Sequence, residues 1–172
     1  MKKILFFAMA FAAIITKAQV NSNFKIGAHV GLPLGDTKDA ITVTTGVDVA
    51  YVWEVAPNFE LGITTGYSAY FYKEAQRINF MDYRYDFRPE PTSLVPVALT
   101  TQYNIAKKVS LGLDLGYGFV LNGNREGGFL YQPKLGVIIG KGNELYVGYK
   151  GISVKGGSVQ SFNIGYAYSF RK

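Results

Sequence analysis

The stretch VSLGLDLGYGFVL, residues 109–121, has two faces of opposite character if it forms a β-strand. Successive side chains of a strand point to opposite sides, so its odd-numbered positions make one wholly apolar face. The even-numbered positions carry glycines, Ser110 and Asp114, with Val120 as the exception. A soluble sheet would turn large polar residues to solvent there. Small residues opposite an apolar face instead favour a strand with lipid outside and a narrow barrel lumen inside.

The composition of the chain supports the same class of protein. Its 172 residues fit one domain, with 20 glycines, 13 tyrosines and 12 phenylalanines. Only 17% of the residues are charged, against about 25% in soluble domains. The chain has no cysteine, so no disulfide can hold the fold and closure of a sheet has to do so.

The amino terminus is typical of a secretory signal peptide over residues 1–18. Lys2 and Lys3 precede an apolar run of about a dozen residues, too short to span a bilayer, and small residues stand before the cleavage point at Ala18. Cleavage leaves a barrel domain of residues 19–172 and removes three lysines, which lowers the net charge from +6 to +3. The basicity is therefore partly a targeting signal, and we expect no nucleic-acid partner.

Apolar and small or polar residues alternate in eight segments, each long enough to cross a membrane when tilted. The expected strands cover residues 24–32, 42–54, 59–72, 92–104, 109–121, 129–140, 144–154 and 161–170. Very short connections alternate with longer or more polar ones, as in outer-membrane barrels, which have short periplasmic turns and longer outside loops. We therefore expect an all-β, eight-stranded antiparallel up-and-down transmembrane barrel in the bacterial outer membrane, with periplasmic termini.

A soluble lipocalin-like barrel is the main alternative. Its apolar face would point inward, but the apolar face here is too large for the interior of eight strands. Turned outward on a soluble monomer, it would exceed the apolar patch that such proteins tolerate. Two local expectations follow from the membrane barrel: a polar loop over residues 33–41, and a bulge or a missing hydrogen bond near Pro133, which lacks a backbone donor.

Several segments resemble a known family. FKIGAHVGLPLG, SLVPVALTTQY, QPKLGVIIG and FNIGYAYSF are similar to the small outer-membrane "porin family" barrels of Bacteroidota, related in architecture to OmpA- and OmpX-type barrels. The resemblance covers the mature chain and rests on pattern. It implies a Gram-negative source, a membrane lipid environment and assembly by the barrel-assembly machinery. Such barrels usually end on an aromatic residue, whereas here Phe170 is followed by Arg171 and Lys172.

The inward-facing positions carry charges of both signs, which would be costly if left unpaired in a narrow space. The candidate lumen charge network consists of Lys25, His29, Asp48, Glu54, Glu60, Asp114, Lys134 and Lys150. It can be a plug of ion pairs, which we favour, or the lining of a selective pore. The single histidine fits a hydrogen-bonding role in the lumen. We expect no catalytic residues, no metal site and no cofactor, because nucleophile elbows, ligand clusters and phosphate loops are missing.

The connection over residues 73–91, KEAQRINFMDYRYDFRPEP, is the most distinctive loop. Its aromatic residues alternate with charged ones, and exposed aromatics with arginines are frequent interface anchors. The candidate outer-loop binding surface consists of Arg77, Tyr83, Arg84, Tyr85, Phe87 and Arg88. The alternative is a strand extension whose aromatics lie at lipid headgroups and whose charges pair across the ladder.

These observations predict a non-enzymatic outer-membrane barrel with a structural or interaction role. Its partners would be lipid and, through the loops, an extracellular or outer-membrane protein. A narrow porin for ions or small solutes is the second interpretation, and a lipid-modifying outer-membrane enzyme is the third.

Overall fold

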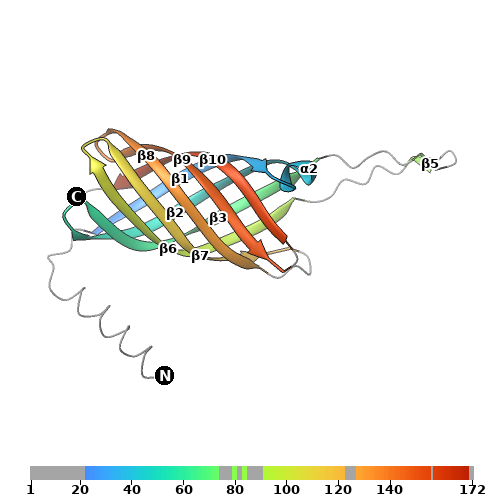
Figure 1. The fold of residues 1–172 in the computed structure, drawn as a ribbon, viewed down its shortest axis with the longest axis horizontal. Helices are drawn as coiled ribbons and strands as arrows, with labels where there is room; N and C mark the ends of the chain where they lie inside the picture. Colours follow the sequence, from blue (N-terminus) through green and yellow to red (C-terminus); the bar gives the residue numbers. More distant parts are fainter. Residues whose placement is uncertain are drawn as a thin grey trace, which may run out of the picture.

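The computed structural model describes residues 22–73, 79–80, 83–84, 91–122, 127–155 and 157–170. Eight antiparallel strands close into one barrel in the order β1-β10-β9-β8-β7-β6-β3-β2 (Figure 1). They are β1 Ser22–Leu34, β2 Ile41–Ala56, β3 Phe59–Tyr72, β6 Thr92–Ala106, β7 Val109–Val120, β8 Gly128–Gly140, β9 Asn143–Val154 and β10 Gly157–Phe170. The expected fold class, an eight-stranded antiparallel barrel, is confirmed. The expected signal peptide, residues 1–18, lies outside the described residues.

Three short elements complete the described chain. A single-turn helix, α2 Thr37–Ala40, lies between β1 and β2, and β4 Asn79–Phe80 pairs with β5 Tyr83–Arg84 beyond the barrel (Figure 1). The expectation of a polar loop over residues 33–41 is wrong at both ends, because β1 runs on to Leu34 and β2 begins at Ile41, and α2 lies between them. The β1–β10 ladder continues to Leu34↔Gln160, and the Thr37 hydroxyl accepts a hydrogen bond from the Gln160 backbone amide, which links the turn to β10. Among the described residues, no helix is long and apolar enough to cross a bilayer.

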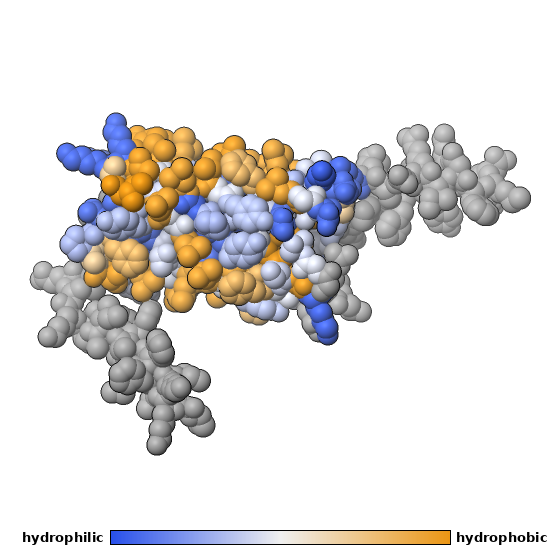
Figure 2. All heavy atoms as spheres, in the orientation of Figure 1, coloured by the Kyte–Doolittle hydropathy of each residue, from blue (hydrophilic) through white to orange (hydrophobic). Residues whose placement is uncertain are grey.

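The two faces of residues 109–121 lie as the alternation predicts. Leu113 and Leu115 are 38% and 42% exposed on the outside, whereas Asp114 between them is 6% exposed and faces the lumen. The same alternation around the barrel places an apolar band on its outer surface, with polar residues gathered at the two ends (Figure 2). Aromatic pairs lie near both ends of this band, for example Phe24 with Phe170 and Tyr117 with Phe119.

Pro133 interrupts one ladder without changing its register. The β8–β9 pairing passes from Tyr131↔Gly151 to Lys134↔Gly148 in the same register, and no pair forms at the two positions between them. The β7–β8 ladder continues through Leu113↔Pro133. Of the two expected outcomes, the structure shows a local gap in the ladder and no bulge. The bulges instead lie near strand ends, for example between Asn104 and Ala106.

Glycines allow neighbouring strands to approach closely at several inward positions, of which Gly116 is the tightest against backbone. A Cβ atom at Gly116 would lie 2.1 Å from the Val97 carbonyl oxygen and 2.4 Å from the Ala98 Cα. Neither atom belongs to a flexible side chain, so only a movement of the β6 backbone could make room for it.

We therefore expect Gly116→Ala to lower the free energy of unfolding by about 1–3 kcal/mol, the usual cost of overpacking. The measurement is urea unfolding of the refolded barrel, followed by fluorescence of Trp53, the single tryptophan. Gly157→Ala is the matched control, because a Cβ atom there would meet nothing within 4 Å. Equal unfolding midpoints for the two variants would contradict the close approach of β6 and β7.

Candidate functional site in the barrel lumen

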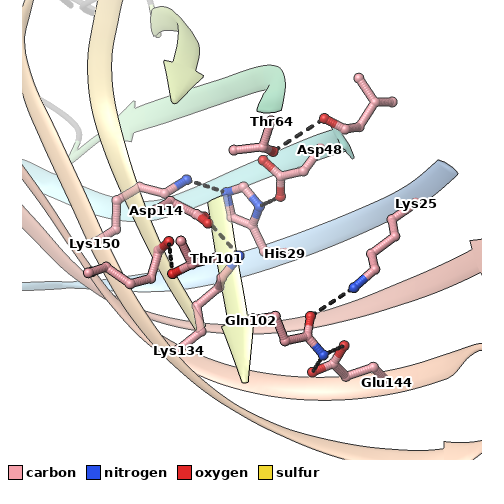
Figure 3. Close-up of polar contacts among 12 residues, drawn as sticks. Lys25, His29, Asp48, Thr64, Thr101, Gln102, Asp114, Lys134, Glu144 and Lys150 are labelled. Carbon is pink, nitrogen blue, oxygen red and sulfur yellow. Dashed lines mark hydrogen bonds and ion pairs between the residues drawn. The ribbon is translucent and has the colours of Figure 1, made fainter. Parts of the chain in front are cut away.

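We call the end of the barrel that carries Ser22, Phe170 and the short turns the terminal end, and the opposite end the loop end (Figure 1). A connected set of polar side chains crosses the lumen near the terminal end. The Lys25 Nζ lies 2.5 Å from a Glu60 carboxylate oxygen and donates a hydrogen bond to the Gln102 Oε1 at 2.8 Å. Gln102 donates in turn to Glu144 at 3.2 Å (Figure 3). Glu144 also accepts from the Ser110 hydroxyl.

A second ion pair lies farther along the lumen, between neighbouring strands. The Lys134 Nζ on β8 is 2.8 Å from a carboxylate oxygen of Asp114 on β7. The two residues are diagonal neighbours, because Gly112 faces Lys134 in the ladder and Asp114 faces Gln132. The same ammonium group lies 5.7 Å from the centre of the Tyr146 ring, within range of a cation–π contact.

His29 connects an acid and a base at mid-lumen. Its Nδ1 is 2.6 Å from a carboxylate oxygen of Asp48, and its Nε2 is 3.1 Å from the Lys150 Nζ (Figure 3). The two ring nitrogens of His29 thus link the Asp48 carboxylate to the Lys150 amino group. Lys150 lies 3.4 Å from the Ser68 hydroxyl and is only 3% exposed.

This arrangement places serine, histidine and aspartate close together, but not as a hydrolytic triad. In such a triad the histidine Nε2 takes the proton of the serine. Here the Lys150 Nζ, not the Ser68 hydroxyl, is the hydrogen-bond partner of the His29 Nε2, and Ser68 is 1% exposed. Among the described residues, no group of three or more His, Cys, Asp or Glu side chains is placed to hold a metal ion.

An apolar cluster occupies part of the loop-end half of the lumen, beside the buried polar side chains of Thr44, Ser161 and Asn163, and the sequence pattern did not predict it. Inward side chains from five strands pack together there: Ile41, Tyr70, Leu94, Ala98, Leu130 and Ile152. Val120, the exception to the alternation in β7, packs against this cluster. The signal was present in the sequence, because several even-numbered positions in the loop-end parts of β6, β8 and β9 are large and apolar.

Two cavities lie in the lumen, one on each side of a buried layer. The terminal-end cavity is about 70 Å³, lined by polar residues such as Gln102 and Glu144, and has room for a few water molecules. The loop-end cavity is about 640 Å³ and reaches Tyr70 on β3 and Ile152 on β9. Ser68 and Lys150 stand between these two linings on the same strands and are buried. No described residue lines both cavities.

The other candidate residues do not join this network. Glu54 faces Glu60 in the ladder but is exposed at the terminal end, where a register shift follows it. No ion pair among the described residues includes Glu54. Of the loop surface, the backbone of Tyr83 and Arg84 forms β5. The loop candidates Arg77, Tyr85, Phe87 and Arg88 lie outside the described residues.

Comparison with solved structures finds small membrane barrels. The attachment invasion locus protein Ail of Yersinia pestis, in a phospholipid bilayer nanodisc, matches with a TM-score of 0.57 and 15% identity over 88% of this chain and all of that one. The crystal structure of Ail matches with a TM-score of 0.56 and 15% identity over 87% of this chain and 97% of that one. The de novo designed barrel TMB2.3 matches with a TM-score of 0.55 and 10% identity over 91% and 100%.

These likenesses concern the fold alone, because all three identities are low. The chain therefore has the fold of small eight-stranded outer-membrane barrels. No family model matches the sequence, and no curated protein matches it. The resemblance to Bacteroidota porin-family barrels thus receives support for its architecture and stays a prediction for the family itself.

The Lys134–Asp114 pair offers a direct test of lumen energetics. Lys134→Met leaves the buried Asp114 carboxylate without its cation, so we expect the free energy of unfolding to fall by about 3 kcal/mol. Replacing both residues in Lys134→Met/Asp114→Leu should recover most of that loss, because no charge then remains unpaired. Lys107→Met, on an exposed short turn, is the control and should change nothing. An equal loss in the single and double variants would contradict the pairing.

Proposed function

We propose that the chain is an integral outer-membrane barrel that does not conduct and that has a structural or interaction role. The observation that carries this proposal is the buried layer between the two lumen cavities. His29, Ser68, Lys150 and Asn163 are all buried, and hydrogen bonds connect the first three across the lumen. Hydrated ions need a continuous water-filled path, and this packed layer lies between two cavities that share no described lining residue.

The proposed topology places the terminal end in the periplasm and the loop end outside the cell. Short turns at one end and longer connections at the other are typical of outer-membrane barrels. Export would follow cleavage of residues 1–18, and the barrel-assembly machinery would insert the mature chain. The fold likeness to Ail, which was solved in a bilayer nanodisc, supports a lipid environment.

The proposed interaction surface is the connection over residues 73–91 between β3 and β6. It joins strands that end and begin at the loop end, where a partner from outside would meet it. Its aromatic residues and arginines suit protein recognition. Ail, one of the similar structures, is named for attachment and invasion. Its sequence identity to this chain is too low to transfer that role, so a partner is proposed here only on the composition of this loop.

A narrow pore is the second candidate function, favoured by the charged lining of the terminal-end cavity. Planar-bilayer recording separates the two. We expect the refolded mature protein, with its barrel verified by heat-dependent gel mobility, to give no discrete current steps. Opening the buried layer in Lys150→Ala/His29→Ala should produce or increase conductance, since that pair blocks the path. Current steps in the unmodified protein that shift in Asp114→Asn would overturn the non-conducting proposal.

The orientation has its own test, because the chain has no cysteine. Single cysteines at Asp39 on α2 and at Lys107 on the opposite short turn are both exposed and mark the two ends of the barrel. A polyethylene-glycol maleimide too large for porins should label Asp39→Cys on intact cells and Lys107→Cys only after permeabilisation. Reversed labelling would place the loop end in the periplasm, and labelling of neither position without lysis would argue against the outer membrane.

A further inference from the structure

The loop-end cavity has the volume and the depth of a ligand site, which a closed structural barrel does not need. It occupies about 640 Å³, within the range of about 300–1,000 Å³ typical of small-molecule sites. Its deepest residues are well buried, with Leu94 3% and Ile152 2% exposed, and they form part of the apolar cluster. The cavity is therefore a cup with a firm floor rather than a shallow depression.

The walls of the cup are also mainly apolar. Tyr72, Val120, Val154 and Val159 come from four different strands and pack against the floor cluster. An apolar body that covers these apolar side chains and displaces water from them gains free energy in proportion to the apolar area covered.

The rim of the cup is polar and carries both signs of charge. Among the described lining residues, Lys155 is the one cation and Asp36 the one acid, and both are exposed. They belong to the β9–β10 and β1–β2 connections, whose strands β1 and β10 are neighbours. A head group with a net charge would gain from one of them and lose from the other, whereas a zwitterionic head can complement both.

We infer that this cup binds a single-chain amphiphile with a zwitterionic head. The chain lies on the floor formed by Leu94, Tyr70 and Ile152, and the head stays at the rim beside Asp36 and Lys155. This site is separate from the lumen charge network, with which it shares no described residue. It neither requires nor excludes conduction, because it lies on the loop-end side of the buried layer.

Fluorescence quenching in lipid nanodiscs tests this inference. Trp53→Phe removes the native tryptophan, and Tyr72→Trp places a reporter on the wall of the cup. Phe71→Trp is the matched control, because Phe71 is the next residue on β3 and lies on the outer, lipid-facing surface. The probe is an alkyl phosphocholine brominated at the far end of its chain, added to detergent-free nanodiscs. Val120→Trp, on β7, is a second reporter should the Tyr72 variant fail to fold.

We expect quenching of the cup reporter, Tyr72→Trp, to saturate as the probe concentration rises. Quenching of the lipid-facing reporter, Phe71→Trp, should rise in proportion to the probe concentration without saturating. Filling the cup with Val154→Phe should weaken binding by about tenfold or more. Ser153→Phe, one residue away on the outer face of β9, should leave binding unchanged. A carboxylate of the same chain length should bind several times more weakly than the phosphocholine.

Four results would overturn the inference. Parallel, non-saturating quenching of both reporters would mean that the probe only partitions into lipid. No quenching of the cup reporter would mean that another occupant, such as residues 74–90 of this chain, excludes the probe. Saturable quenching that Val154→Phe leaves unchanged would place the binding site outside the cup. Tighter binding of the carboxylate would overturn the zwitterionic head.

Discussion

Closure of the hydrogen-bond ladder between the first and last strands is the constraint on which the rest of this structure depends. β1 pairs with β10 from Phe24↔Phe170 to Leu34↔Gln160 without a register shift. In lipid, each backbone group that lacks a partner costs several kcal/mol, so a sheet can cross a membrane only when it has no edge. The chain has no disulfide to hold its ends together, and this ladder performs that task.

Closure with only eight strands leaves a narrow interior, and the inward side chains show how the chain meets that limit. A Cβ atom at Gly46 would lie 2.5 Å from the His29 ring, and one at Gly165 would lie 2.3 Å from the Tyr146 ring. These two large inward side chains thus each lie over a glycine of a neighbouring strand. The glycines that give the sequence its unusual composition are therefore the spaces into which the lumen network fits.

The strands could be predicted from the sequence because the alternation of apolar with small or polar residues depends only on which face of each strand meets lipid. The ion pairs could be predicted only in part. Asp114 and Lys134 are on consecutive strands, so their diagonal contact follows from the register. Lys25 and Glu60 have β2 between their strands, and His29 and Lys150 have β10 between theirs. Such contacts depend on the barrel's diameter and stagger, which the alternation of residues does not specify.

The apolar cluster in the loop-end half of the lumen follows from the same geometry. Several inward positions near the loop end carry large side chains such as Leu94, Leu130 and Ile152, which pack without needing partners of opposite charge. Buried charges require complete pairing, whereas an apolar cluster tolerates a gap above it. The polar network on one side of Lys150 and the apolar cluster on the other therefore have different roles in the lumen. The polar network fixes which inward side chains pair with one another, and the apolar cluster leaves a cup that opens toward the loop end.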